Sequence, residues 1–110
     1  MLYKTIWVSK AAFDCLVCLG GGTTELLKEV KTMAYENRSC VALQRGIEIC
    51  MKVRFDNELA AALREAEELS SFSPSFAYPL YQAIEEFYKR KKDYPNAQFV
   101  RAERIRVLGF

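Results

Sequence analysis

Nine residues near the middle of the chain constrain its fold more than any other stretch. Between Ile47 and Phe55, five apolar side chains alternate strictly with four others. Successive side chains of a β-strand point to opposite sides, so this period-two pattern is typical of a strand with one buried face. We therefore expect an amphipathic strand whose buried face carries Ile47, Ile49, Met51, Val53 and Phe55.

The residues before this segment predict its neighbour in the sheet. Gly46 closes a short link over residues 44–46. A three-residue hairpin loop places its last residue in the left-handed region, which glycine adopts without strain. Residues 39–43 would then form the first strand of a hairpin, in a register that places Cys40 opposite Cys50.

Helical periodicity appears on both sides of this hairpin. Apolar residues recur at three- and four-residue spacing over residues 25–34, 58–69 and 79–92. Asp56 or Asn57 is expected to cap the second of these helices. A Ser/Pro-rich loop at residues 70–79 is expected to separate the second helix from the third.

Strands are expected at both ends of the chain, around residues 6–8 and 104–107, the latter after a turn at residues 94–96. The resulting order is strand, helix, hairpin, one or two helices, strand. This order predicts an α+β fold of the ferredoxin-like βαββαβ type, an antiparallel sheet with helices on one face. Residues 12–19 fit either an extra strand or a helix.

Composition indicates one small cytoplasmic domain. The chain has 110 residues, of which 51% are hydrophobic and 27% charged, as in ordinary globular proteins. No apolar run reaches the roughly 18 residues of a membrane span, and we expect no signal peptide. The absence of histidine removes the commonest general base and metal ligand, so we favour a non-catalytic protein without a cofactor.

The four cysteines leave several interpretations open. Cys15 and Cys18 form a C-x-x-C, and Cys40 and Cys50 would meet in the hairpin. A structural zinc site needs four such ligands, but the spacing of the second pair is wrong for a zinc knuckle. We favour cysteine as a small buried hydrophobe over metal binding or redox chemistry.

A glycine run immediately precedes the first expected helix. Free backbone N–H groups at a helix start, together with hydroxyls, can bind a phosphate or another small anion. The run lacks the closing Lys-Ser/Thr of a P-loop. It remains a candidate anion or nucleotide site, made of Gly20, Gly21, Gly22, Thr23 and Thr24.

The second face of the expected sheet is the main functional prediction. It would be open to solvent and would combine aromatic with basic side chains: Tyr3, Trp7, Lys52, Arg54, Arg104 and Arg106. Phe76 and Tyr78, in the expected 72–78 loop, would add a lip beside it. Such a face suits a protein partner or a homodimer, because Trp, Tyr and Arg are frequent interface anchors.

Single-stranded nucleic acid is the alternative partner for the same face, since bases stack on aromatic side chains and phosphates pair with arginine. The net charge of +2 does not by itself imply nucleic acid. We therefore expect a small interaction or regulatory protein, with nucleic-acid binding and anion binding as alternatives.

Overall fold

The computed structural model describes residues 38–110, apart from the side chains of residues 38–40 and 43. This part of the chain contains helices and no strand: α4 (Arg38–Met51), the π-helical turn η1 (Lys52–Asp56), α5 (Leu59–Phe72), α6 (Pro74–Arg90) and α7 (Tyr94–Leu108). The predicted α+β, ferredoxin-like fold is therefore wrong. The elements predicted at 6–8, 12–19 and 25–34 lie outside the described residues.

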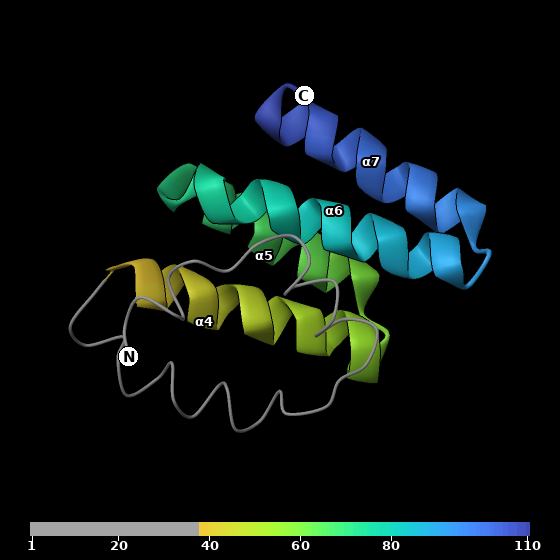
Figure 1. Cartoon of the computed structure of the whole chain (residues 1–110), viewed down its shortest axis with the longest axis horizontal. Helices are drawn as coiled ribbons and strands as arrows, with labels where there is room; N and C mark the ends of the chain where they lie inside the picture. The colour runs from red at the N-terminus through yellow and green to blue at the C-terminus, as the bar shows by residue number, and fades with distance from the viewer. Residues whose placement is uncertain (1–37) are drawn as a thin grey trace.

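Helices α4, α5 and α7 pack around α6. In Figure 1, α6 (teal) lies between α4 (yellow) and α7 (blue), while α5 (green) lies behind. Helix α6 contacts each of the other three, and α5 contacts α4, α6 and α7. Helix α6 makes the more extensive contacts of the two and lies at the centre of the described structure, and α7 lies at its edge.

Helix α4 replaces the predicted hairpin. The alternating pattern would have exposed Cys50 and buried Phe55, but Cys50 is 1% exposed and Phe55 is 56% exposed. The buried positions instead recur at helical spacing of four, three and four residues: Ala42, Gly46, Ile49 and Val53. The β-branched Ile and Val residues favour strands intrinsically, and burial against neighbouring helices overrides that preference.

The expected hairpin contacts disappear with the hairpin. Gly46 lies in the middle of α4, where it is buried rather than closing a turn. Cys40 and Cys50 lie ten residues apart on one helix, which separates their backbones by about 15 Å along the axis. The predicted pairing of these two cysteines is therefore wrong.

A helix over residues 58–69 was predicted and is confirmed as α5, but its start differs. Asn57 adopts a left-handed conformation (φ 54°) and donates its N–H to the carbonyl of Lys52, so it ends η1. The residue that caps α5 is Glu58, whose side chain makes no capping hydrogen bond. Capping by Asp56 or Asn57 is wrong. The inward face of α5 carries Ala62, Leu63, Ala66 and Leu69.

The Ser/Pro-rich loop expected at residues 70–79 is also wrong, since only Ser73 separates α5 from α6. Pro74 begins α6, where a missing N–H removes no helical hydrogen bond. Pro79 lies further inside the helix and leaves the carbonyl of Ser75 without its usual donor. Burial of Phe76, Ala77 and Leu80 in this turn offsets that loss. The helix predicted from Pro79 is confirmed as the remainder of α6.

Helix α7 replaces the turn and strand predicted at the end of the chain. Asp93 caps it, because its carboxylate accepts from the backbone N–H of Asn96 (3.4 Å) and from the side-chain amide of Asn96 (2.7 Å). Pro95 suits the first turn. Gly109 ends the helix with φ 88° and donates its N–H to the carbonyl of Ile105 (2.8 Å).

The core gathers between α6 and its neighbours. Its largest fully buried side chains are Tyr81, Ile47, Ile49, Leu69, Leu80, Ile84, Val53 and Val100. Three of the eight come from α6, and only Val100 comes from α7. None of the helices over residues 38–110 has the length and apolar character needed to cross a bilayer.

Candidate functional site

Helix α7 packs chiefly on α6 and more lightly on α5. Ala97 and Val100 are its two buried residues, at 2% and 0% exposure. Two small or medium side chains form a short apolar contact for a helix of 15 residues. Leu108, which is partly buried, also packs against the core, and polar contacts add to this attachment.

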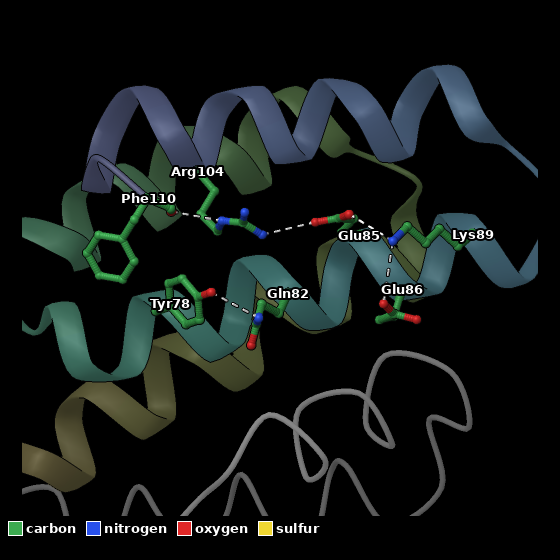
Figure 2. Close-up of polar contacts among 7 residues, drawn as sticks. All are labelled: Tyr78, Gln82, Glu85, Glu86, Lys89, Arg104 and Phe110. Carbon is green, nitrogen blue, oxygen red and sulfur yellow. Dashed lines mark hydrogen bonds and ion pairs between the residues drawn. The ribbon is translucent and has the colours of Figure 1, made fainter.

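A buried carboxylate fastens α7 to α6. Glu85 of α6 is 6% exposed, and its Oε1 accepts a hydrogen bond from Nη1 of Arg104 at 3.1 Å, as Figure 2 shows. Lys89 places its ammonium 3.1 Å from the other oxygen of Glu85. Both oxygens of this carboxylate are therefore occupied by cations, which is the condition under which a buried charge is tolerated.

Arg104 also holds the residues that follow α7. Its Nε donates to the carbonyl of Phe110 at 3.0 Å (Figure 2). The ring of Phe110 stacks on that of Tyr78 at 5.0 Å between centroids, and the guanidinium of Arg104 lies 5.3 Å from the Tyr78 centroid. These contacts fix the carboxyl end of α7 against the first half of α6.

A second, exposed ion-pair network joins α7 to α5. Nη2 of Arg106 lies 2.7 Å from Glu67 and 2.8 Å from Glu103. The hydrogen bond to Glu103, followed by that to Glu67, raises the pKa of Arg106. The same hydrogen bond lowers the pKa of Glu103. Because all three groups are solvent-accessible, this network orients the helices more than it stabilises them.

An open groove of about 900 Å³ lies beside this network. It is lined by Arg64, Glu67, Glu68, Ser70, Ser71, Pro74, Arg106, Val107 and Leu108. The hydroxyls of Ser70 and Ser71 donate to backbone carbonyls of their own helix, at 2.6 and 2.8 Å. Arg106 is held by Glu67 and Glu103, whereas the side chains of Arg64 and Glu68 line the groove without an ion pair to another described residue.

The hydroxyl of Tyr81 is buried and has no hydrogen-bond partner among residues 38–110. Burial, reinforced by the carboxylates of Glu67 and Glu103, raises the pKa of Tyr81 to about 12. The phenol therefore stays neutral at physiological pH, and we assign it a packing role.

The outward face of α7 is the most distinctive surface of the described structure. Four residues at spacings of four, three and four lie within an arc of about 60° on a helix of 3.6 residues per turn. We call them the α7 outer stripe: Tyr94, Gln98, Arg101 and Ile105. Tyr94 is 55% and Ile105 45% exposed, so two large apolar side chains face solvent at the two ends of the stripe.

Apolar residues on α7 are spread around the helix rather than gathered on its inward side. Within residues 38–110 no element covers the outer stripe, and Arg101 there makes no ion pair with another described residue. Phe99, 50% exposed, lies about 100–160° around the helix from these four residues and faces a different direction.

Basic residues lie at the amino end of this stripe. Lys91 and Lys92 form the exposed turn between α6 and α7, and Lys92 adopts a left-handed conformation (φ 60°). The ammonium of Lys91 lies 5.0 Å from the centroid of Phe87. The outer stripe and this turn together form an exposed surface of aromatic, aliphatic and basic character.

Within residues 38–110, the predicted sheet face does not form a surface. Lys52 lies on η1, where it pairs with Glu65 at 2.6 Å, and this hydrogen bond raises the pKa of Lys52. Arg54 lies over Phe55, 5.6 Å from its centroid. Arg104 and Arg106 lie on α7, where Arg104 pairs with Glu85 of α6 and Arg106 pairs with Glu67 of α5 and Glu103 of α7. The structure therefore distributes these four basic residues over two separate parts of the molecule.

The remaining predicted site residues divide into two groups. Phe76 is buried at 8% exposure and Tyr78 is half-buried, so neither forms an exposed lip, although Tyr78 does meet Arg104. Tyr3, Trp7 and the candidate anion site at residues 20–24 lie outside the described residues and stay predictions.

Cysteine chemistry is limited in the described part of the chain. Cys50 is a free thiol in the core, and burial raises its pKa. Among residues 38–110, no three potential metal ligands gather into a site. Cys50 is thus a small buried hydrophobe, as the sequence suggested, while Cys15 and Cys18 lie outside the described residues.

Comparisons of the chain with protein-family models, with curated proteins and with solved structures found no match. The functional argument consequently depends on the surface of α7 itself. Sequence reasoning missed the outer stripe because residues 104–107 were interpreted as a strand. The signal was present in the spacing of Tyr94, Gln98, Arg101 and Ile105, bounded by the Asp93 cap and Gly109.

Proposed function

We propose that this chain is a protein-interaction module that presents the α7 outer stripe to a partner protein. The observation that carries the proposal is the pair Tyr94 and Ile105, large apolar side chains left exposed on a helix that is firmly anchored from behind. Aromatic and arginine side chains are enriched at the energetic centres of protein interfaces, and the stripe contains both types.

The anchoring of α7 supports this proposal. A binding surface on a rigid helix loses less conformational entropy on association than one on a mobile loop. The Glu85–Arg104 pair and the Tyr78–Phe110 stack hold the carboxyl half of α7, and the Asp93 cap defines its amino end. The expected partner is an amphipathic helix whose apolar residues pack against Tyr94 and Ile105.

Protein binding is favoured over nucleic-acid binding by the state of the arginines. Phosphate contacts require cations that are free to replace counterions. Arg104 and Arg106, two of the expected phosphate ligands, each hold at least one carboxylate of the chain. A cytoplasmic location is part of the proposal, because the buried free thiol of Cys50 suits a reducing compartment.

Site-specific photocrosslinking in cells tests the proposal. A photoreactive phenylalanine analogue in place of Tyr94 is expected to yield a discrete crosslinked protein, and Ile105→Glu in the same chain is expected to abolish that product. The matched control places the analogue at Phe55, which is also exposed but lies on η1. Identical products from positions 55 and 94, or a product that survives Ile105→Glu, would contradict the proposal.

The nucleic-acid alternative has its own outcome. Fluorescence anisotropy of a labelled single-stranded oligonucleotide at low salt should show no binding. Binding that weakens steeply with salt and is lost on Arg101→Ala would instead assign the α7 surface to nucleic acid.

A further inference from the structure

We infer that α7 is a releasable strap: it detaches from α6 as a unit while α4, α5 and α6 stay folded, and its release withdraws the α7 outer stripe from a partner. This inference rests on the proposed function and names the regulation of the same surface. Two observations carry it. The face of α6 beneath α7 is polar as well as aromatic, and it includes a buried hydroxyl that has no hydrogen-bond partner among residues 38–110.

The covered face of α6 differs from an aliphatic core. Its residues recur at spacings of three, four and three, within an arc of about 80° on an α-helix. We call them the α6 tyrosine stripe: Tyr78, Tyr81, Glu85 and Tyr88. The last three are buried, and Tyr78 is half-buried. Every member carries a side-chain oxygen, so α7 covers polar groups together with the aromatic rings.

Contacts from α7 and the preceding turn reach this stripe at both ends. Arg104 lies 5.3 Å from the ring centroid of Tyr78 and donates to Glu85 at 3.1 Å (Figure 2). At the other end, the backbone carbonyl of Tyr88 accepts the N–H of Asp93 at 2.9 Å. The tyrosine stripe is therefore the surface that α7 covers, and release of α7 would return it to water.

The hydroxyl of Tyr81 favours this release. Burial, followed by the carboxylates of Glu67 and Glu103, raises the pKa of Tyr81, which places its hydroxyl near the ion-pair network between α5 and α7. A buried hydroxyl without a partner destabilises the folded state, because it has lost its hydrogen bonds to water. Water would restore those hydrogen bonds once α7 has left.

The attachment of α7 depends strongly on one ion pair. Its inward face is short of large apolar side chains: Ala97 and Val100 are buried, and Leu108 is partly buried. On the same face, Arg104 pairs with Glu85, and their side chains are only 12% and 9% exposed. Loss of either partner of a shielded pair is strongly destabilising. We call this pair the latch of the strap.

The position of α7 permits it to move by itself. Residues 91–93 join it to α6, and Lys91 and Lys92 in this turn are exposed. Helix α7 lies at the edge of the described structure, so its departure displaces no other described helix (Figure 1). Elements with few buried apolar contacts open locally at a lower free energy than the whole fold.

Released α7 would lose the outer stripe. Isolated helices of about 12–15 residues are marginal in water, and α7 has 15 residues. Tyr94 and Ile105 share one face only while the helix is formed. A partner that binds this face therefore also stabilises the docked state, and release of the latch weakens binding.

Hydrogen exchange of the whole chain, measured residue by residue at low urea concentrations, tests the opening. Amides of residues 98–108 should share one opening and exchange at least about tenfold faster than the slowest amides of residues 80–88. Equal rates with equal urea dependence would mean that α7 opens only when the whole fold unfolds, and would overturn the inference.

A substitution in α4 separates the two kinds of opening. Ile49→Val should speed the slowest amides of residues 80–88 by about threefold to tenfold, because it weakens the core. Amides of residues 98–108 should keep their wild-type rate, because Ile49 stays buried when α7 is released. Acceleration of both sets by the same factor would overturn the inference.

Two substitutions in the tyrosine stripe should change the exchange of α7 in opposite directions. Glu85→Gln weakens the latch and should speed the amides of residues 98–108 by about tenfold or more. Tyr81→Phe removes the hydroxyl without a partner and should slow them by up to about fivefold. The control Glu86→Gln, at a side chain that is 35% exposed, should leave their rate unchanged. The same rate in all three variants as in wild type would contradict the role of the stripe.

Crosslinking from position 94 tests the regulation. Glu85→Lys places a like charge beside Arg104, so it should leave residues 98–108 almost unprotected while residues 80–88 keep measurable protection, and it should abolish the crosslink. The control Glu86→Lys should retain both. A crosslink that survives the loss of protection in α7 would overturn the regulatory role and leave the proposed function standing. Separate opening of α7 in a wild-type chain that yields no crosslink would remove the proposed function, and the regulatory role with it.

Discussion

Helices α6 and α7 are similar in length and both begin with proline in the first turn, but they place their apolar residues differently. Nine residues of α6 are buried, against only Ala97 and Val100 of α7. Helix α7 leaves Tyr94, Phe99 and Ile105 in solvent. The apolar residues of α6 are accounted for by the core, whereas those of α7 exceed what its packing on α6 requires.

This difference separates stability from binding. Burial of apolar surface is the main favourable term in folding, so α6 should dominate the stability of the described helices. Exposed apolar side chains on α7 add little to the folded state and remain available for association. Substitutions of buried residues on α6 should therefore lower stability, whereas substitutions of exposed apolar residues on α7 should lower binding and leave stability unchanged.

The largest expected effect on stability comes from the inward face of α6. Leu80→Ala should lower the free energy of unfolding by about 2–5 kcal/mol, because it leaves a cavity at a fully buried position. The matched change on α7, Ile105→Ala, should stay within about 0.5 kcal/mol of wild type. Urea denaturation measures both variants. Equal losses of unfolding free energy would contradict the difference in stability contribution between α6 and α7.

The attachment of α7 to α6 should be the next most sensitive feature. Glu85→Ala leaves the guanidinium of Arg104, whose side chain is 12% exposed, without its carboxylate. The loss should be about 3 kcal/mol, since an uncompensated charge stays close to the core. Glu86→Ala is the control. Glu86 lies 3.8 Å from Lys89 and its side chain is 35% exposed, so this substitution should lower the free energy of unfolding only slightly.

The sequence predicts a helix correctly where the apolar residues fit helical spacing and fit no alternating pattern. Leu63, Ala66 and Leu69 of α5 follow helical spacing and fit no alternating pattern, so this helix was predicted. The second half of α6 was predicted for the same reason. These segments bury the faces that the spacing indicates.

Prediction failed where two periodicities overlapped. Ile47, Ile49 and Val53 alternate like a strand, but with Ala42 and Gly46 they also form a helical stripe. Contacts of α4 with α5 and α6 decide between the two, and contacts between distant segments are not visible in a local pattern. Ile105 and Val107 also alternate like strand residues, although they lie on α7. The helical spacing of Tyr94, Gln98, Arg101 and Ile105 competes there with the alternation of residues 104–107.

One substitution inside α6 is expected to raise stability rather than lower it, by a smaller amount. Tyr81→Phe should raise the free energy of unfolding at neutral pH by up to about 1 kcal/mol, because it removes a buried hydroxyl that has no partner within residues 38–110. Thermal melting checks this prediction. The exposed Tyr94→Phe should leave the melting temperature unchanged.

The same variant should change the alkaline limb of the stability profile. The pKa of Tyr81 is raised from 10.0 to about 12 in the folded chain, so the unfolded chain loses this proton first. Its contribution to stability is therefore complete below pH 10 and is lost as the pH rises through about 12. Tyr81→Phe should make stability fall less steeply over that window. An unchanged slope would mean that Tyr81 ionises equally in both states.

The most direct test of the separation between fold and binding is urea denaturation of Ile105→Glu, at a concentration where the chain is monomeric. A charged residue at a spare, solvent-facing position should leave the free energy of unfolding within about 0.5 kcal/mol of wild type. The same protein should lack the crosslink from position 94. A loss of about 2 kcal/mol or more would instead place Ile105 in the core and contradict the account.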